Sequence, residues 1–156
     1  MRGLLQPLFR LSHWIARKSW LITRPISVGV RLLLVKDQTV LLVKHTYGQR
    51  WYLPGGGVSK GETLEEAARR EASEEIGAEL GNLRLFGVYS NFCEHKSDHV
   101  LVFLCRDFAL TGTRGPEIKD WHFFHFDSLP EGSSPGTGRR IAEYVNDANR
   151  PVIGPW

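Results

Sequence analysis

The segment from residue 55 to residue 77 constrains the fold of this 156-residue chain more than any other feature. Three consecutive glycines, Gly55 to Gly57, are followed by Thr63 and Glu66, which have the spacing of a helix-capping box. In such a box the hydroxyl accepts a hydrogen bond from the third helical amide, and the carboxylate accepts one from the cap amide. Gly77 can adopt the left-handed conformation that ends a helix. The pattern therefore predicts a glycine-rich loop and then a helix between residues 63 and 77.

Strand-like segments lie on both sides of this helix. Residues 27–43 carry alternating apolar side chains around an Asp37-Gln38 turn, which is the pattern of a hairpin. Three later segments rich in branched and aromatic residues are expected to be strands, over residues 83–89, 100–108 and 121–126. A final helix is expected over residues 138–147. This order predicts an α/β or α+β sandwich, in which helices pack on the faces of a mixed sheet.

The predicted helix carries three glutamates on one face. Glu71, Glu74 and Glu75 are three and four residues apart, so their carboxylates repel one another by roughly 0.2–0.5 kcal/mol per exposed pair. Mg²⁺ would offset this repulsion, since it prefers oxygen ligands and is usually bound by a few carboxylates together with substrate phosphates. A solvated acidic face paired with Arg69 and Arg70 is the alternative. The glycines favour the metal, because their backbone can approach a cation and a phosphate without side-chain obstruction.

The loop and the helix together resemble the signature of a known family. Gly56, Glu62 and the run Arg70-Glu71-Ala72-Ser73-Glu74-Glu75-Ile76-Gly77-Ala78 match the Nudix box, G-x5-E-x7-R-E-U-x-E-E-x-G-U, at every specified residue. U is a bulky or aliphatic residue, and Ala72 and Ala78 are small for that position but apolar. The box covers residues 56–78, and the strand pattern around it resembles a Nudix domain over about residues 26–148. The resemblance implies a Nudix-type α/β/α sandwich with a mixed sheet.

The resemblance to Nudix hydrolases also implies a reaction and a set of site residues. We expect Mg²⁺ or Mn²⁺ to support hydrolysis of a nucleoside diphosphate linked to another moiety, X. Carried over residue by residue, Glu71, Glu74, Glu75 and the carbonyl of Gly55 would bind the metal. Arg70 would orient the glutamates, and Glu62 would hold the loop against the helix. Metal ions at such a site neutralise substrate charge and activate water for in-line attack on phosphorus, so a Ser, Cys or His nucleophile is not required.

A general base is expected either in the box or in a later loop. Glu117 lies just before a strand that is led by Trp121, where the loop glutamate of many Nudix enzymes falls. It is the first candidate for the base or for an additional metal ligand. Asp120, Glu94 and Asp98 are the competing candidates.

Substrate contacts are expected around the glycine loop. Gly55, Gly56 and Gly57 would approach the phosphates closely, while Tyr47 and Arg50 could stack on a base and pair with a phosphate. Markers of the ADP-sugar, diadenosine polyphosphate and coenzyme A branches are absent, which disfavours those substrates. The expected partner is a small nucleotide-type molecule; nucleic acid is disfavoured, although capped RNA stays among the candidates. A catalytically silent protein that only binds a nucleotide is the alternative function, and it is disfavoured because all three box glutamates are retained.

Residues 1–25 form a basic amphipathic segment ahead of the expected Nudix domain of residues 26–156. Leu4, Leu8, Leu11 and Ile15 fall on one side of a predicted helix. Residues 1–36 hold seven of the 20 Lys and Arg and none of the 17 Asp and Glu, which leaves 13 basic and 17 acidic groups for residues 37–156. The basic charge is therefore local and does not indicate nucleic-acid binding by the main domain. We expect the helix to pack on its own domain or in a homodimer, with weak contact to an anionic membrane surface as the alternative.

Two further observations bear on the compartment. Cys93 and Cys105 lack the spacing of a metal or redox motif, and no apolar run reaches the length of a membrane span. Basic residues also interrupt any signal-peptide core. The sequence therefore predicts a cytoplasmic protein, with peripheral membrane contact through residues 1–25 as the alternative.

Overall fold

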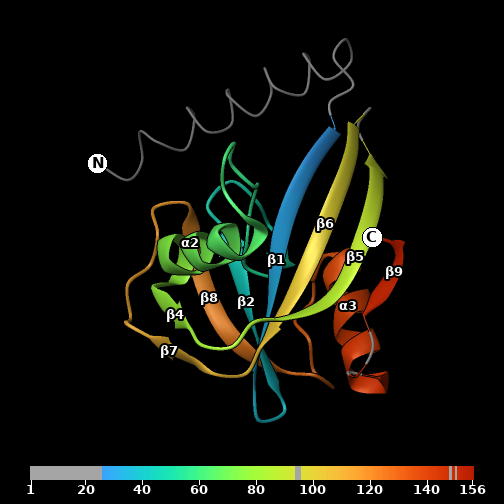
Figure 1. The fold of residues 1–156 in the computed structure, drawn as a ribbon. Coiled ribbons are helices and arrows are strands. Elements are labelled where there is room, and N and C mark those ends of the chain that lie inside the picture. The colour runs from blue at the N-terminus through green and yellow to red at the C-terminus, as the bar shows by residue number, and fades with distance from the viewer. Residues whose placement is uncertain (1–25, 94–95, 148, 150) are drawn as a thin grey trace.

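The computed structural model describes residues 26–93, 96–147, 149 and 151–156 (Figure 1). The segment of residues 1–25, with its predicted helix, lies outside the described residues. In chain order the elements are β1 (Ile26–Lys36), β2 (Thr39–His45), β3 (Trp51–Tyr52), α2 (Leu64–Ile76), β4 (Ala78–Leu80), β5 (Arg84–Cys93), β6 (Lys96–Cys105), β7 (Phe108–Leu110), β8 (Ile118–His125), α3 (Pro135–Asn146) and β9 (Val152–Pro155). Neither helix in this part of the chain has the length and apolar character needed to cross a membrane.

The main sheet is mixed and runs β3-β2-β1-β6-β5-β9, with β8 pairing on β2. β1 is parallel to β6 and β9 is parallel to β5, while β2 pairs antiparallel with both β3 and β8. β1 and β2 pair only beside their turn, at Val35 with Val40 and at Lys36 with Thr39. The hairpin predicted from the sequence is therefore present but splays open, and one edge of β1 is left for another segment to pair with.

The core lies on both faces of β1 and β2. Leu32 and Leu34 pack towards α2, whereas Leu33 and Val35 pack towards α3. All four side chains are at most 3% exposed. A strand that is covered on both faces is an uninterrupted apolar run, since both sets of alternating side chains are buried. The two helices lie on opposite faces of the sheet (Figure 1), which confirms the predicted mixed sheet flanked by helices.

Both ends of α2 are where the sequence places them. The Thr63 hydroxyl accepts from the Glu66 amide at 3.2 Å, and the Glu66 carboxylate accepts from the Thr63 amide at 2.8 Å. Gly77 ends the helix with φ of 61° and donates back to the Ser73 carbonyl. Three alanines, Ala67, Ala68 and Ala72, form the buried face together with Ile76, so the backbone of the helix can lie close to the sheet.

Gly77 offers a stability test of this local structure. Replacing it with Ala would place a Cβ 2.1 Å from Thr113 Oγ1 and 2.5 Å from Thr111 Oγ1, in a left-handed conformation that already disfavours a side chain. We expect Gly77→Ala to lower the free energy of unfolding by at least about 1–2 kcal/mol, measured by urea denaturation. Gly61, which also has positive φ but open space around its Cβ position, is the matched control for the backbone cost alone. Equal losses in the two alanine variants would show that the threonine contacts do not matter.

Two predicted boundaries are wrong for identifiable reasons. The last helix begins at Pro135, three residues earlier than predicted, because the Ser134 side chain caps it and Pro135 occupies the first turn. The strand predicted over residues 100–108 is interrupted between Cys105 and Phe108. Asp107 accepts from the Gly81 amide there, which turns the chain out of the main sheet so that β7 can pair with β4.

Candidate active site

The glycine loop occupies the open edge of β1. The amides of Val30 and Leu32 donate to the carbonyls of Gly56 and Pro54 at 2.9 and 2.8 Å. Between them, Gly55 has φ of 129°, and a Cβ there would lie 2.3 Å from the Val30 carbonyl oxygen. Glycine is therefore required at this position both by conformation and by space. The Pro54 and Gly56 carbonyls, on either side of Gly55, accept hydrogen bonds from β1. The Gly55 carbonyl takes no part in this pairing, which leaves it for other contacts.

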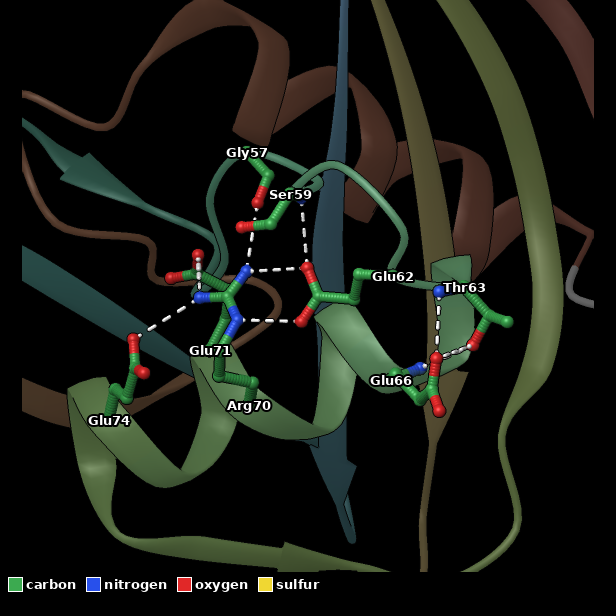
Figure 2. A network of polar contacts seen from close by, with 8 residues as sticks. All are labelled: Gly57, Ser59, Glu62, Thr63, Glu66, Arg70, Glu71 and Glu74. Carbon is green, nitrogen blue, oxygen red and sulfur yellow. Dashed lines mark hydrogen bonds and ion pairs between the residues drawn. The ribbon is translucent and has the colours of Figure 1, made fainter.

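Arg70 connects the loop to the glutamate helix (Figure 2). Its guanidinium donates to both Glu62 carboxylate oxygens, at 2.7 and 3.0 Å, and to the Gly57 carbonyl at 3.0 Å. The same group donates to Glu71 at 2.7 Å and to Glu74 at 3.2 Å. Planar, charge-assisted contacts of this kind fix orientation as well as supplying attraction. The contacts are those expected of a residue that orients the glutamates.

Glu62 completes this connection from the loop side. Besides Arg70, its carboxylate accepts from the Ser59 amide at 2.9 Å. The hydrogen bonds from Arg70 and then from Ser59 lower the pKa of Glu62 to about 2, so the ion pair persists at neutral pH. Residues 59 and 62 of the loop are in this way held to the first half of α2.

The loop and helix border a cleft of about 540 Å³, which is within the usual size range for small-ligand sites. The sequence-predicted residues that line it are Tyr47, Gly55, Gly56, Gly57, Glu71, Glu74, Glu75 and Glu117. The further lining residues are Arg31, His45, Gly115, Pro116 and Ile118. Segments from five parts of the chain therefore meet at one cleft, and four carboxylates face it.

Glu75 is the most buried of these carboxylates. It is 9% exposed, accepts from the Gly55 amide at 2.8 Å, and has His45 Nε2 3.9 Å from its other oxygen. Burial raises the pKa of Glu75 to about 7, although the Gly55 amide and the Arg31 charge oppose the shift. Burial and the Arg31 charge lower the pKa of His45 to about 4, so the imidazole is neutral at pH 7. Among the described residues, Glu75 is thus a buried carboxylate whose contacting partners are a backbone amide and a neutral imidazole.

Glu117 approaches the cleft from the loop before β8. The Gly115 amide donates to the Glu75 carbonyl at 3.0 Å, and the Thr46 amide donates to the Glu117 carbonyl at 2.8 Å. A Cβ on Gly115 would lie 2.2 Å from the Glu74 carbonyl oxygen, so the loop lies against the end of α2. Burial, then the charges of Glu71 and Glu74, raise the pKa of Glu117. The loop glutamate chosen from the sequence therefore faces the box glutamates.

Several candidates from the sequence are not brought to the cleft. Arg50 lies exposed in the loop before β3 and is not among the residues that line the cleft. Asp120 contacts Arg114 and His122, and Asp98 accepts from Ser27, so the structure disfavours both as the base. Glu94 lies outside the described residues.

Arg31 and His45 are site residues that the sequence reasoning missed. Arg31 interrupts the apolar run of β1, and His45 is the last residue of β2, after its apolar run. A charged residue inside a strand that is otherwise buried is the signal that could have identified Arg31. Among the cleft-lining residues of the described chain, Arg31 is the one permanently cationic side chain.

The donor set suits a hard divalent cation, although the carboxylates are held by other partners. Within the described ranges, no three His, Cys, Asp or Glu side chains converge closely enough to hold a metal ion as they stand. Arg70 holds Glu71 and Glu74, and Gly55 donates to Glu75. A Cβ on Gly56 would lie 2.5 Å from Glu71 Oε1, so this carboxylate lies directly against the glycine backbone. Oxygen donors that repel one another in a shared cleft are the chemistry that Mg²⁺ or Mn²⁺ fits.

Gly56 offers a test of the contact between the loop and Glu71. We expect Gly56→Ala to lower kcat/KM roughly 10-fold or more, because the new methyl group must displace the Glu71 carboxylate, and a misplacement of about 1 Å can cost that much. Gly138→Ala is the matched control. Gly138 lies on α3 and does not line the cleft, and a Cβ there would enter open space. Equal activity of the two variants in a steady-state assay would contradict the assigned position of Glu71.

In the described part of the chain, a mixed sheet carries one helix on each face, and a cleft lies between the glycine loop and the glutamate-bearing helix. A family model described as the NUDIX domain matches residues 23–144. The chain belongs to the Nudix hydrolase family.

Three curated relatives illustrate the similarity. An ADP-ribose pyrophosphatase of Methanocaldococcus jannaschii is 34% identical over 110 residues, which are 67% of this chain and 65% of the relative. An NAD-capped RNA hydrolase NudC of Vibrio atlanticus is 33% identical over 135 residues, 82% of this chain and 47% of the relative. A putative 8-oxo-dGTP diphosphatase of Bacillus subtilis is 45% identical over 121 residues, 75% and 78% of the two chains. The chain spans just under two thirds of the first relative and about half of the second.

A solved structure supports the same family. The MutT NUDIX hydrolase of Burkholderia pseudomallei superposes with a TM-score of 0.68 at 26% identity, over 76% of this chain and 97% of that chain. The superposition covers nearly all of the related protein.

Proposed function

We propose that the protein uses a divalent cation, Mg²⁺ or Mn²⁺, to hydrolyse a phosphoanhydride bond in a nucleoside diphosphate linked to another group. The observation that carries the proposal is the convergence of Glu71, Glu74, Glu75 and Glu117 on one cleft beside the glycine loop. Four carboxylates facing each other are unfavourable for stability, and a cation together with an anionic phosphate substrate resolves the repulsion.

The residues that would hold the cation are Glu71, Glu74, Glu75 and the Gly55 carbonyl. When bound there, a divalent cation supplies charge neutralisation on the diphosphate and lowers the pKa of a coordinated water. Arg70 fixes the orientation of Glu71 and Glu74 through the contacts described above. The glycine backbone permits close approach of the phosphates, because no side chain stands between them and the loop.

The remaining cleft residues bind substrate and move a proton. Glu117 is the proposed general base, since it lines the cleft beside the box glutamates, and burial, then the charges of Glu71 and Glu74, raise its pKa. Arg31 would pair with a phosphate oxygen as the cationic side chain of the cleft. Tyr47, which stacks on His45 with ring centroids 5.0 Å apart, would offer its ring to the base or sugar. Arg50 is not included, because it does not line the cleft.

The substrate is proposed only as a class. The relatives are named for ADP-ribose, NAD-capped RNA and 8-oxo-dGTP, which share a nucleotide phosphoanhydride and little else. Capped RNA therefore stays among the substrates to be tested, although the partner expected from the cleft size is a small molecule.

The experiment is a substrate panel on the full chain with Mg²⁺, with Mn²⁺ and with EDTA. The panel contains ADP-ribose, NADH, 8-oxo-dGTP, the common nucleoside triphosphates, diadenosine polyphosphates, nucleotide sugars and NAD-capped RNA. Release of phosphate, pyrophosphate or mononucleotide that depends on the metal supports the proposal. Binding of a nucleotide without turnover under every condition would instead support the catalytically silent alternative, and turnover that persists in EDTA would contradict the metal requirement.

A further inference from the structure

In the described part of the chain, one face of the sheet carries large exposed apolar side chains around a polar centre formed by Ser90, Ser97 and His99. Paired residues of neighbouring strands lie on the same face, so Ile26 of β1, Ser97 of β6 and Phe92 of β5 lie in one row. Ile153 of β9 lies on the same face, in a row with Val88. Ile26, Phe92 and Ile153 are 76%, 77% and 86% exposed. We name this surface, formed by Ile26, Val28, Val88, Phe92 and Ile153, the upper sheet face.

The upper sheet face is uncovered because α2 is too short to reach it. The same face of β1 carries Val30, Leu32 and Leu34 further along the strand, where α2 packs and exposure is zero. Figure 1 shows the upper ends of β1, β6 and β5 extending beyond α2. On the opposite face of the same strands, Tyr89 and Val100 are buried in the α3 cluster. Large side chains exposed together on one sheet face are uncommon in a monomer and indicate a missing partner.

The chain itself carries a segment with the right chemistry next to this surface. Residues 1–25 end at Pro25, immediately before Ile26, which is the first residue of the upper sheet face. Leu4, Leu8, Leu11 and Ile15 form one apolar stripe on a helix. From Leu4 to Ile15 such a stripe is about 17 Å long, since a helix rises 1.5 Å per residue. Four strands from β1 to β9 span about 14 Å, so the two lengths agree.

We infer that residues 1–25 fold back, and that residues 4–15 form an amphipathic helix whose stripe of Leu4, Leu8, Leu11 and Ile15 covers the upper sheet face of the same chain. Residues 16–25 supply the connection; extended at about 3.3 Å per residue, these ten residues reach about 33 Å, which is more than the roughly 14 Å spanned by the four strands. The basic side chains of the segment then lie on the outer side of the helix, in solvent. This assigns the segment to the domain rather than to a membrane or to a second copy of the chain.

The inference is tested by site-specific photo-cross-linking of the full chain. Benzoylphenylalanine replaces Phe92 in one protein and Val145 in the control, because Val145 is 56% exposed on α3, away from the upper sheet face. A mixture of isotopically light and heavy protein separates cross-links within one chain from those between chains. We expect position 92 to cross-link to peptides from residues 1–25 of the same chain and position 145 not to do so.

A second pair of variants keeps the result informative if cross-linking is weak. Leu8→Asp places a charge in the stripe, whereas Gln6→Asp places the same charge on the opposite side of the helix. We expect Leu8→Asp to reduce the cross-link from position 92 several-fold and Gln6→Asp to leave it unchanged. Cross-links from position 92 only to a second copy, no cross-link to residues 1–25, or equal effects of the two aspartates would overturn the inference. Loss of the cross-link when the protein sediments with phosphatidylcholine–phosphatidylserine vesicles would overturn it in favour of a membrane surface.

Discussion

Replacing Glu75 with Gln is expected to lower kcat by about 10²-fold or more, measured on the best substrate from the panel. Gln has the same shape and can still accept from the Gly55 amide, but it lacks the charge required of a metal ligand. Of Glu71, Glu74 and Glu75, Glu75 is held by burial and a backbone contact, whereas Arg70 holds the other two. Its loss should therefore affect metal binding without disturbing the network of Figure 2.

For the same variant, Glu75→Gln, we also predict a change in thermal stability that depends on pH. Because burial raises the pKa of Glu75 to about 7, the folded protein binds this proton more tightly than the unfolded chain, whose value is near 4.5. The ionised carboxylate consequently lowers stability at pH 8, and this loss disappears as the pH falls towards 4.5. We expect metal-free Glu75→Gln to have a Tm at pH 8 equal to or above that of the wild type. Added Mg²⁺ should raise the Tm of the wild type more than that of the variant.

Glu79→Gln is the matched control, because Glu79 is an exposed glutamate on β4. It should have wild-type turnover and a wild-type response of Tm to Mg²⁺. Near wild-type kcat in Glu75→Gln, together with an unchanged Mg²⁺ response, would remove Glu75 from the metal ligands. A large fall in Tm in the metal-free protein would show instead that its carboxylate is mainly structural.

The parts of the fold that the sequence predicted are those specified by local interactions. The limits of α2 follow from Thr63, Glu66 and Gly77, each of which acts within one turn of the helix. The turn at Asp37, which has positive φ of 54°, is likewise a local feature between two apolar runs. The box residues could be assigned to one helical face because helical spacing alone determines which side chains are neighbours.

The rest of the site depends on contacts between distant segments. Arg31 and His45 reach the cleft because β1 and β2 diverge and the glycine loop pairs with β1 between them. The residue pattern of each strand alone does not predict where the two strands separate. Arg50 does not line the cleft for the related reason that closeness in sequence to the glycine loop does not place a side chain there.

Arg140, in the buried cluster between the sheet and α3, is another residue whose environment local sequence does not predict. An arginine near the middle of an amphipathic helix is ordinarily exposed, yet Arg140 is 2% exposed beneath the last strand. Its guanidinium lies 3.8 Å from the centroid of the Tyr89 ring, donates to the Pro155 carbonyl at 3.0 Å and pairs with Glu143 at 2.7 Å. These contacts hold β9 against the domain, and β9 itself was not predicted because its four residues follow Pro151 and include Gly154 and Pro155.

Replacing Glu117 with Gln is expected to lower kcat by about 10²-fold while changing KM much less, because a general base acts in the transition state. The Thr46 amide donates to the Glu117 backbone carbonyl, and the neighbouring Gly115 amide donates to the Glu75 backbone carbonyl, so the loop should keep its position in the variant. Asp120→Asn is the matched control from the same segment, since Asp120 contacts Arg114 and His122 rather than the cleft, and it should retain wild-type kcat. Steady-state kinetics at saturating metal separate the outcomes. A defect in Glu117→Gln confined to KM would assign Glu117 to substrate binding, and a larger kcat defect in Asp120→Asn would transfer the role of base to Asp120.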